Sequence, residues 1–333
     1  MTHVSGIGSW PGDSAREAIV TVRDLLTDVD GLGIPYLPEL PSRGPGSDII
    51  GRSAALLVDL PVGLEPSGWR LTDRPGRDLA RAGSLWRQDL DELAEAYDGY
   101  AGPLKIQVAG PWTLAASIEL PRGERVVSDE GARRDLVASL AEGVRRHVGE
   151  VQRLVPGAEL TVQLDEPSVV AVLAGRLPTA SGYGRVRAVD RAEVARGIRE
   201  VREAYAGDVV LHTCDPTAPV EILAGTGASA LALDLTDAGP QRWEAVAAAL
   251  ETGIRLWAGV VPTAPVTSPA GAVREATRRV ADGFAAVGMP SARLAEVTVT
   301  PACGLPGLTP PQAVTVQRVA ADAAREITEK EDG

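Results

Sequence analysis

Eight short apolar runs recur along the chain, and each is followed by a longer stretch with helical periodicity. Runs that are apolar on both faces are typical of parallel strands in a sheet covered by helices. We expect strands at Val4–Ser9, Gly33–Leu37, Leu104–Ala109, Glu159–Leu164, Asp208–Leu211, Ala228–Leu233, Arg255–Gly259 and Leu294–Thr300. Eight successive βα units predict an α/β fold of the (βα)8 TIM-barrel type, in a single domain over residues 1–333.

The chain is longer than the roughly 250 residues typical of such a barrel. The extra length lies after the second expected strand, in residues 47–100, which we interpret as an insertion. A doubly wound sheet is the rival fold, but it needs a glycine-rich phosphate loop after its first strand. The segment GIGSWPG is interrupted by proline and does not fit that loop. Residues 328–333 are expected to be a frayed tail after a helix at Pro310–Ile327.

The net charge of −12 and the pI near 4.9 disfavour nucleic acid or an anionic membrane as a partner, because both attract basic patches. No apolar run reaches the roughly 18 residues of a membrane span. The N-terminus has neither the basic region nor the apolar core of a signal peptide. We therefore expect a cytoplasmic protein, in which two cysteines are free thiols, metal ligands or nucleophiles rather than a disulfide.

Three metal-binding side chains stand at strand ends. His212 and Cys214 end the fifth strand, and Cys303 follows the eighth. In an extended segment, residues two apart point to the same face, and the carboxyl ends of barrel strands face one mouth. Two soft thiols with an imidazole suit Zn²⁺, and Asp234 at the end of the sixth strand is a candidate fourth ligand. Each residue alone is better explained as part of the core, but the three together favour a metal.

The other two histidines are expected to have no role in a site. His3 lies in the N-terminal arm, and His147 in RRHVGE is expected on a solvated helix face. Among the acids, Asp165 and Glu166 form a pair at the end of the fourth strand, suited to holding an ammonium group or to acid–base catalysis. The alternative is that Asp165 caps the next helix, with Pro167 in its first turn.

The turn after the first strand has two interpretations. Gly8 allows the backbone to approach a ligand closely, and the Ser9 hydroxyl could hold a carboxylate. A plain tight turn explains the same residues equally well.

The stretches GIGSWP, VAGPWTL, QLDEP, LHTC and TPACGL are spread from residue 6 to residue 305. With them the chain resembles the catalytic C-terminal barrel of cobalamin-independent methionine synthase. That family belongs to a wider group with uroporphyrinogen decarboxylase and corrinoid-dependent thiol methyltransferases. The decarboxylase branch lacks a thiolate zinc site, so LHTC and TPACGL favour a thiol methyltransferase.

The resemblance implies that zinc activates the thiol of homocysteine, which then accepts a methyl group to become methionine. The family's fourth zinc ligand is a glutamate, whereas the matching acid here is Asp234. The residues that the resemblance assigns are zinc ligands His212, Cys214, Asp234 and Cys303, carboxylate contacts Ile7, Gly8 and Ser9, and an amino-group contact, Asp165. Beside these, Asp165 and Glu166 are our candidate catalytic acids, and Trp112 after the third strand is a candidate substrate contact.

Three departures from the family concern the methyl donor and the amino-group contacts. The sequence has no counterpart of the family's N-terminal domain, which helps hold polyglutamyl folate. The family's proton-donating histidine after strand seven is missing from GVVPTAPV, and a second acid after strand two is not evident, although Glu39 and Asp48 lie nearby. The donor is therefore methyltetrahydrofolate or, with a slight preference, a methylcobalamin or other methylcorrinoid, free or protein-bound.

Two other functions stay open at this point. One is a corrinoid-dependent methyltransferase that acts on another thiol. The other is a non-catalytic protein that binds zinc and thiols, in which four protein ligands close the metal site.

Overall fold

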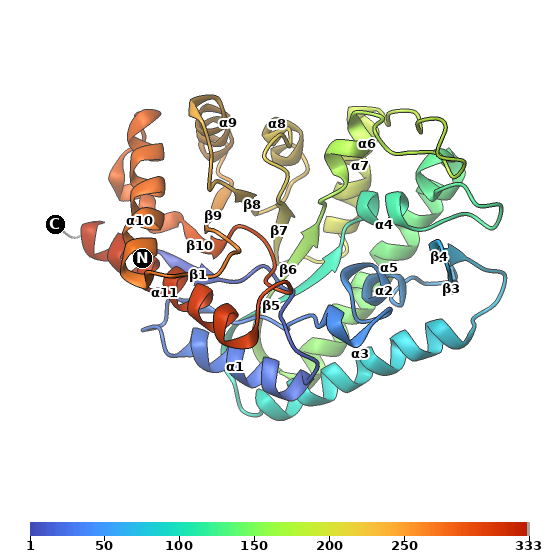
Figure 1. Ribbon diagram of the computed structural model, residues 1–333, viewed down its shortest axis with the longest axis horizontal. Coiled ribbons are helices and arrows are strands. Elements are labelled where there is room, and N and C mark those ends of the chain that lie inside the picture. Colours follow the sequence, from blue (N-terminus) through green and yellow to red (C-terminus); the bar gives the residue numbers. More distant parts are fainter. Residues whose placement is uncertain (332–333) are drawn as a thin grey trace.

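The computed structural model describes residues 1–331 and has an α/β barrel architecture (Figure 1). Eight parallel strands form one sheet in the order β2-β1-β10-β9-β8-β7-β6-β5. All eight expected strands are confirmed. They are β1 His3–Ser5, β2 Gly33–Ile34, β5 Ala101–Ala109, β6 Gly157–Asp165, β7 Asp208–Thr213, β8 Ala230–Asp234, β9 Arg255–Val261 and β10 Thr298–Pro301.

The first two strands are shorter than expected. β2 ends at Ile34 because Pro35 has no N–H to donate to a ladder. The chain nevertheless continues beside β5, where Lys105 N donates to Pro35 O at 2.8 Å and Leu37 N donates to Lys105 O at 3.0 Å. A parallel bridge between Tyr36 and Lys105 joins the two ends of the sheet and closes the barrel.

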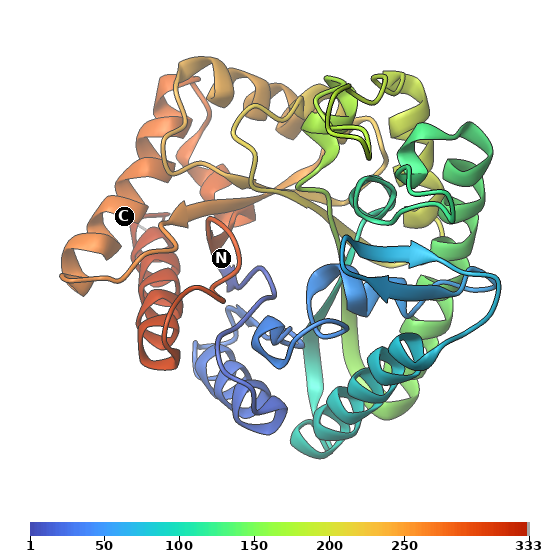
Figure 2. The same ribbon diagram turned by 45° about the vertical axis from the view of Figure 1, so that its right-hand side comes forward.

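Helices surround the strands in a ring, with their apolar faces against the sheet (Figure 2). The amphipathic pattern of the chain produces this layer, as expected for parallel strands. The helices are α1 Ala15–Thr27, α2 Ile49–Ala54, α3 Arg77–Ala96, α4 Pro111–Ser117, α5 Glu130–Leu154, α6 Val169–Leu173, α7 Arg191–Arg202, α8 Val220–Ala224, α9 Pro240–Glu251, α10 Pro269–Ala286 and α11 Pro310–Glu331.

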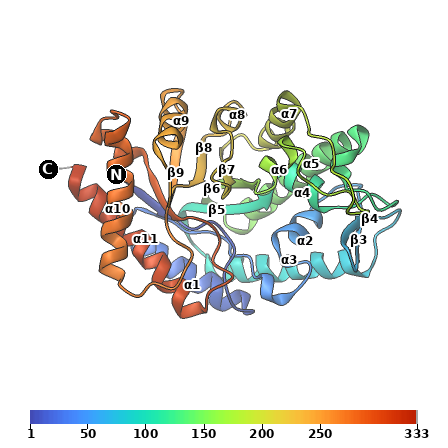
Figure 3. The same ribbon diagram turned by 45° about the horizontal axis from the view of Figure 1, so that its top comes forward.

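The insertion between β2 and β5 holds α2, α3 and an antiparallel hairpin of β3 (Val62–Glu65) and β4 (Gly68–Leu71). The hairpin lies at the outside of the ring, beside α3 and α5 (Figure 3). It is tied to the segment after α4, since Leu71 N donates to Glu119 O at 2.8 Å. The insertion therefore covers one side of the barrel and does not form a second domain.

The interior of the barrel is divided into an apolar layer and a polar layer. Alternate residues of each strand point inward, and the apolar layer consists of Ile7, Val210, Ala230, Ala232 and Trp257. The polar layer lies on β5 and β6 and consists of Lys105, Gln107, Gln163 and Asp165, all at most 3% exposed. Since Gln107 pairs with Gln163 and Ala109 with Asp165 in register, this layer leads toward the carboxyl end of the strands.

His147 is not on a solvated face, so that expectation is wrong. Its ring is 2% exposed and stacks on Trp86 of α3 with centroids 4.5 Å apart. The charged neighbours in RRHVGE suggested solvent, but α3 of the insertion packs against this side of α5. Burial lowers the pKa of His147 to about 3, and the nearby Arg52 guanidinium adds to this effect. His3 also differs from the expectation, because it begins β1 opposite Thr298 instead of lying in an arm.

The last helix, α11, extends four residues beyond the expected end and reaches Glu331. Residues 328–331 of the expected frayed tail are therefore helical, and residues 332–333 lie outside the described residues. No helix within residues 1–331 is both long and apolar enough to cross a lipid bilayer.

Candidate active site at the carboxyl end of the strands

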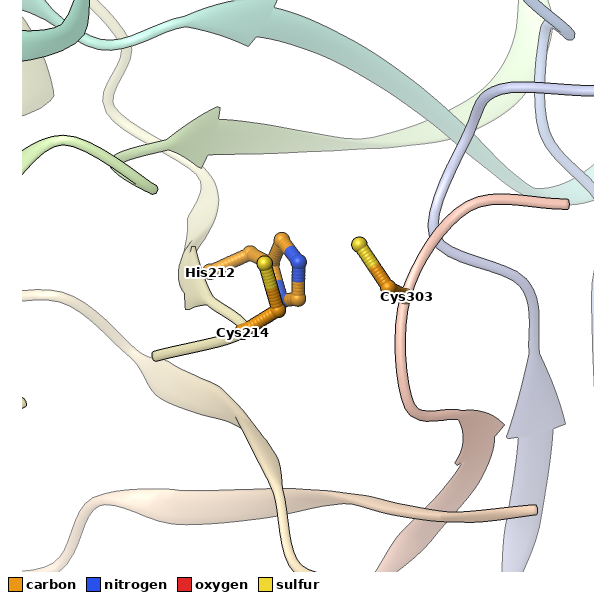
Figure 4. Close-up of side chains that lie close together, drawn as sticks. All are labelled: His212, Cys214 and Cys303. Atoms are coloured by element: carbon orange, nitrogen blue, oxygen red, sulfur yellow. The ribbon is translucent and has the colours of Figure 1, made fainter. Parts of the chain in front are cut away.

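His212, Cys214 and Cys303 meet at the mouth of the barrel (Figure 4). One ligand atom from each residue lies within 4.8 Å of the others. Val210 and His212 point inward on β7, and Cys214 continues the same alternation just past the strand end. The cysteines are partly exposed, whereas His212 is 3% exposed. This histidine–dithiol group could bind a metal ion.

The imidazole is oriented by the neighbouring strand. His212 Nδ1 lies 3.1 Å from Ala232 O, a contact in which Nδ1 carries the hydrogen and donates it. Nε2 is then the nitrogen left to coordinate a metal, which is the usual arrangement of a metal-binding histidine. The small side chain of Ala232, which is fully buried, leaves room for the ring.

The two thiols lie in hydrogen-bonding contact with each other. The Cys303 thiol donates a hydrogen bond to Cys214, and with His212 this lowers the pKa of Cys214 to about 4. The same interaction and burial raise the pKa of Cys303. A bound cation would favour the ionised form of both thiols.

Asp234, expected as a fourth ligand, is not brought into this group. Its Oδ1 accepts hydrogen bonds from Thr236 N at 2.9 Å and from Thr236 Oγ1 at 2.7 Å. An aspartate readily closes such a turn onto the residue two positions later. Its side chain, one methylene shorter than glutamate, is held by the loop after β8 instead of reaching the two thiols.

Asp165 lies at the end of β6, opposite His212 in register. Its Oδ1 accepts a hydrogen bond from Gln163 Nε2 at 2.7 Å, and the residue is 3% exposed. Burial raises its pKa to about 7, against the opposing effects of His212 and Lys105. The helix α6 starts after Ser168 without a side-chain cap, so Asp165 does not serve as the helix cap that we considered.

Glu166 faces the start of α4. Its Oε1 accepts from Trp112 N at 2.9 Å, and its Oε2 accepts from Thr113 N and Thr113 Oγ1, both at 2.8 Å. These donors include backbone N–H groups that a helix start leaves without partners. Burial raises its pKa to about 8. Gly110 is required here, because a Cβ would lie 2.4 Å from Glu166 Oε1.

The turn after β1 approaches the polar layer closely. Gly8 has a φ of 154°, and a Cβ there would lie 2.8 Å from the Gln107 side chain. The next residue, Ser9, donates from Oγ to Glu39 Oε2 at 3.0 Å. Leu305 N donates to Ser9 O at 2.8 Å, so the turn also contacts the segment that carries Cys303.

Glu39, which the sequence analysis named only as an acid near the second strand, lies at the site. It is 1% exposed, and its Oε1 has no hydrogen-bond partner among the described residues. Burial raises its pKa, while Arg52, Ser9 and Lys105 oppose the shift. A carboxylate with a free buried oxygen is suited to hold a cationic group. Its position soon after a predicted strand end, like that of Asp165, could have identified Glu39 as a site residue. The prolines in PYLPELP made the end of the strand hard to locate.

Trp112 is placed against the outer helices. Its Nε1 donates to Val194 O of α7 at 2.9 Å, and its ring packs on Gly197. Only 1% of the residue is exposed. These contacts show that Trp112 packs α4 against α7.

The fold and the site together define a class of protein. A (βα)8 barrel carries its chemistry at the carboxyl ends of its strands, and here a histidine–dithiol group lies there with buried carboxylates. This chain belongs to the family of the cobalamin-independent synthase catalytic domain, whose model matches residues 2–326. The resemblance noted in the sequence is thereby confirmed, and the protein is an enzyme of the methyltransferase class.

One solved structure agrees with the fold. A B12-independent methionine synthase from Shewanella sp. W3-18-1, determined in complex with selenomethionine, superposes with a TM-score of 0.63 at 12% identity, covering 98% of each chain. A "putative dihydrodipicolinate synthetase" from Pseudomonas aeruginosa gives a TM-score of 0.44 at 14% identity, covering 100% of this chain and 79% of the other. No protein with a curated description matches the sequence significantly.

Proposed function

We propose that this protein transfers a methyl group to the sulfur of homocysteine and so produces methionine. The observation that carries the proposal is the convergence of His212, Cys214 and Cys303 within 4.8 Å at the mouth of a barrel of this family. Two sulfurs and an imidazole nitrogen are ligands that zinc prefers. We propose zinc as the cofactor held by these three residues.

The donor set fits zinc in number and in exposure. Three protein ligands and an open fourth position are typical of catalytic zinc sites, whereas structural sites are closed by four protein ligands. Because Cys214 and Cys303 are partly exposed and Asp234 is held by Thr236, this site favours catalysis over the closed, non-catalytic alternative. Zinc bound there would keep a thiol substrate ionised at neutral pH, where a free thiol with a pKa near 8.5 is mostly protonated.

The carboxylates beside the metal group are suited to the amino acid part of the substrate. We propose that Asp165 and Glu39 hold the ammonium group, since each has a buried carboxylate oriented by one neighbour. The turn at Ile7, Gly8 and Ser9 would hold the substrate carboxylate through backbone groups and the serine hydroxyl. These contacts would aim the sulfur at the methyl donor and lower the entropic part of the barrier. We propose that Glu166 positions α4 through Trp112 and Thr113 rather than contacting the substrate.

The transfer forms one S–C bond and breaks the bond between the methyl carbon and its carrier. The electron pair of the broken bond stays with the carrier. A folate nitrogen that leaves in this way needs a proton, whereas cob(I)alamin does not. The three histidines of the chain are His3 at the opposite end of β1, His147 on α5 and the ligand His212, so no further histidine serves as proton donor. We therefore favour a methylcorrinoid as donor, free or protein-bound, over methyltetrahydrofolate.

The test combines metal analysis with a transfer assay. Purified protein is expected to contain about one zinc per chain and to methylate homocysteine when methylcobalamin is supplied. Methyltetrahydrofolate should be tested alongside, and 2-mercaptoethanol should be tested as an alternative thiol. Zinc at full occupancy without transfer to any thiol from either donor would identify a binding protein and contradict the proposal. Faster transfer to 2-mercaptoethanol than to homocysteine would favour the alternative of another thiol substrate.

A further inference from the structure

Lys105 lies inside the barrel, on β5, and is one of only two lysines in the chain. It is fully buried. Its Nζ donates to Ile7 O at 2.7 Å, to Gln163 Oε1 at 2.8 Å and, with a longer contact of 3.3 Å, to Gln107 Oε1. An ammonium group has three hydrogens and no acceptor, so each hydrogen has a partner and the group is fixed in place.

Gln163 extends these contacts toward the mouth of the barrel. Its Oε1 accepts from Lys105, which forces its amide nitrogen to face the opposite way. That nitrogen donates to Ile7 O at 2.7 Å and to Asp165 Oδ1 at 2.7 Å. The lysine therefore determines which end of the amide faces Asp165, because a flipped amide would place two donors against each other and an oxygen against a carboxylate.

Gln107 makes the corresponding connection to the segment that follows β2. Its Oε1 accepts from Lys105, and its Nε2 donates to Leu37 O at 2.6 Å. Leu37 lies two residues before Glu39, and the Gln107 side chain also packs against Gly8. The segments that carry Ile7, Glu39 and Asp165 are thus all connected, directly or through one amide, to the same ammonium group.

We propose that Lys105 is a positioning residue that makes the site selective for an α-amino acid thiol over a simple thiol. It orients Asp165 through Gln163, and it fixes the turn at Ile7 through its backbone oxygen. The inference rests on the proposed function, because it assumes that Asp165 and this turn bind the amino acid groups. Burial lowers the pKa of Lys105 to about 7, against the opposing effects of Asp165 and Glu39, and in its protonated form the lysine limits the repulsion between these two carboxylates.

The metal group is held by other elements. His212 and Cys214 come from β7, and Cys303 follows β10, whereas Lys105, Gln107 and Gln163 lie on β5 and β6. No hydrogen bond of the lysine or of the two amides goes to a proposed metal ligand among the described residues. Loss of the lysine should consequently disturb amino acid recognition and leave metal binding and thiol reactivity in place.

The experiment compares Lys105→Met with the wild-type protein. Methionine keeps the unbranched shape and removes every donor. The dissociation constant for L-methionine, measured by calorimetry, is expected to rise about tenfold or more, which corresponds to the loss of one or two well-placed hydrogen bonds. The KM for homocysteine should rise similarly, while zinc content and turnover of 2-mercaptoethanol stay within about twofold. An unchanged affinity for L-methionine, or an equal loss for both thiols, would overturn the inference.

Two further variants keep the test decisive. Gln163→Met removes the amide that connects the lysine to Asp165, and it should reproduce the selective loss even if Lys105→Met fails to fold. Gln317→Met is the matched control, because Gln317 is also a fully buried glutamine but donates to Ser5 O from α11. A loss of L-methionine affinity in the control as large as in Gln163→Met would refute a specific role.

Binding of L-methionine requires no methyl donor, so it separates this inference from the proposed function. If the wild type binds L-methionine and Lys105→Met does not, the inference stands even where no methyl transfer is found. A wild-type protein that methylates homocysteine and binds L-methionine, with both properties unchanged in Lys105→Met, would contradict the inference alone.

Discussion

Ser9 Oγ donates a hydrogen bond to Glu39 Oε2 at 3.0 Å, and this contact joins the loops that follow β1 and β2. The backbones support it, because Trp10 N donates to Glu39 O at 2.7 Å and Glu39 N donates to Gly8 O at 3.1 Å. The proposed carboxylate site and one proposed ammonium contact therefore form a single rigid unit. The other oxygen of Glu39 is left without a described partner.

The first prediction concerns Glu39→Gln. The amide oxygen can still accept from Ser9, but the negative charge is lost, so an ammonium group should bind more weakly. We expect the KM for homocysteine to rise about tenfold or more, with zinc content unchanged. Asp48→Asn is the matched control, since Asp48 caps α2 through Ile50 N and Gly51 N and asparagine caps equally well. A KM that increases as much in the control would refute the assignment.

The second prediction is that Cys303→Ser lowers zinc content and abolishes methyl transfer, because a serine hydroxyl is a poor ligand for zinc at neutral pH. Metal content measured by atomic emission and the transfer rate check it. Thr300→Val serves as control on the same segment, since Thr300 is fully buried and its hydroxyl has no described partner. A serine variant with full zinc content and wild-type turnover would exclude Cys303 as a ligand.

For the third prediction, Asp234→Asn should keep both zinc and activity near wild-type values. The asparagine oxygen can accept the same two hydrogen bonds from Thr236 that Asp234 accepts now. If Asp234 were instead the fourth ligand, the neutral amide would weaken zinc binding by about tenfold or more. A competition titration with a zinc chelator distinguishes the two outcomes.

Glu166→Gln provides the fourth prediction, which concerns stability. The amide nitrogen would face one of the donors from Trp112 and Thr113, and a buried donor would lose its partner. We expect the free energy of unfolding to fall by about 1–3 kcal/mol, measured by urea denaturation. Unchanged stability would show that the helix start does not depend on this carboxylate.

The fifth prediction concerns acid sensitivity and His147. The folded-state pKa of about 3 lies below the unfolded value of 6.5, so the unfolded state binds the proton first as the pH falls. The contribution of neutral His147 to the free energy of unfolding is complete above pH 6.5. It is lost as the pH falls toward 3, by up to about 1.4 kcal/mol per pH unit. His147→Phe, which preserves the stack on Trp86, should show a flatter dependence in that interval. Parallel curves for the two proteins would exclude His147 as the source.

Most of the barrel could be predicted because strand formation depends on local apolar runs and their spacing. The metal group could be predicted for a related reason, since residues two apart on a strand and residues at strand ends have fixed directions. His212, Cys214 and Cys303 follow from these two rules alone.

Other features depend on contacts between distant segments and could not be predicted. The β3–β4 hairpin forms beside Glu119, and the burial of His147 depends on Trp86 from the insertion. The direction of the Asp234 side chain could not be predicted either, because it depends on a hydrogen bond from Thr236 N that competes with metal binding. Lys105 did leave a signal, since a lysine within the apolar strand PLKIQV is unusual.

The position of the insertion has a practical consequence for protein engineering. The insertion connects β2 to β5, the two end strands that the Tyr36–Lys105 bridge joins. Its β3–β4 hairpin can therefore change in length without shifting the register of any strand in the barrel. The turn at Pro66 and Ser67 joins β3 to β4, and this hairpin lies at the outer edge of the molecule (Figure 3). A reporter or donor-carrying module grafted into that turn would leave the mouth of the barrel open to ligands.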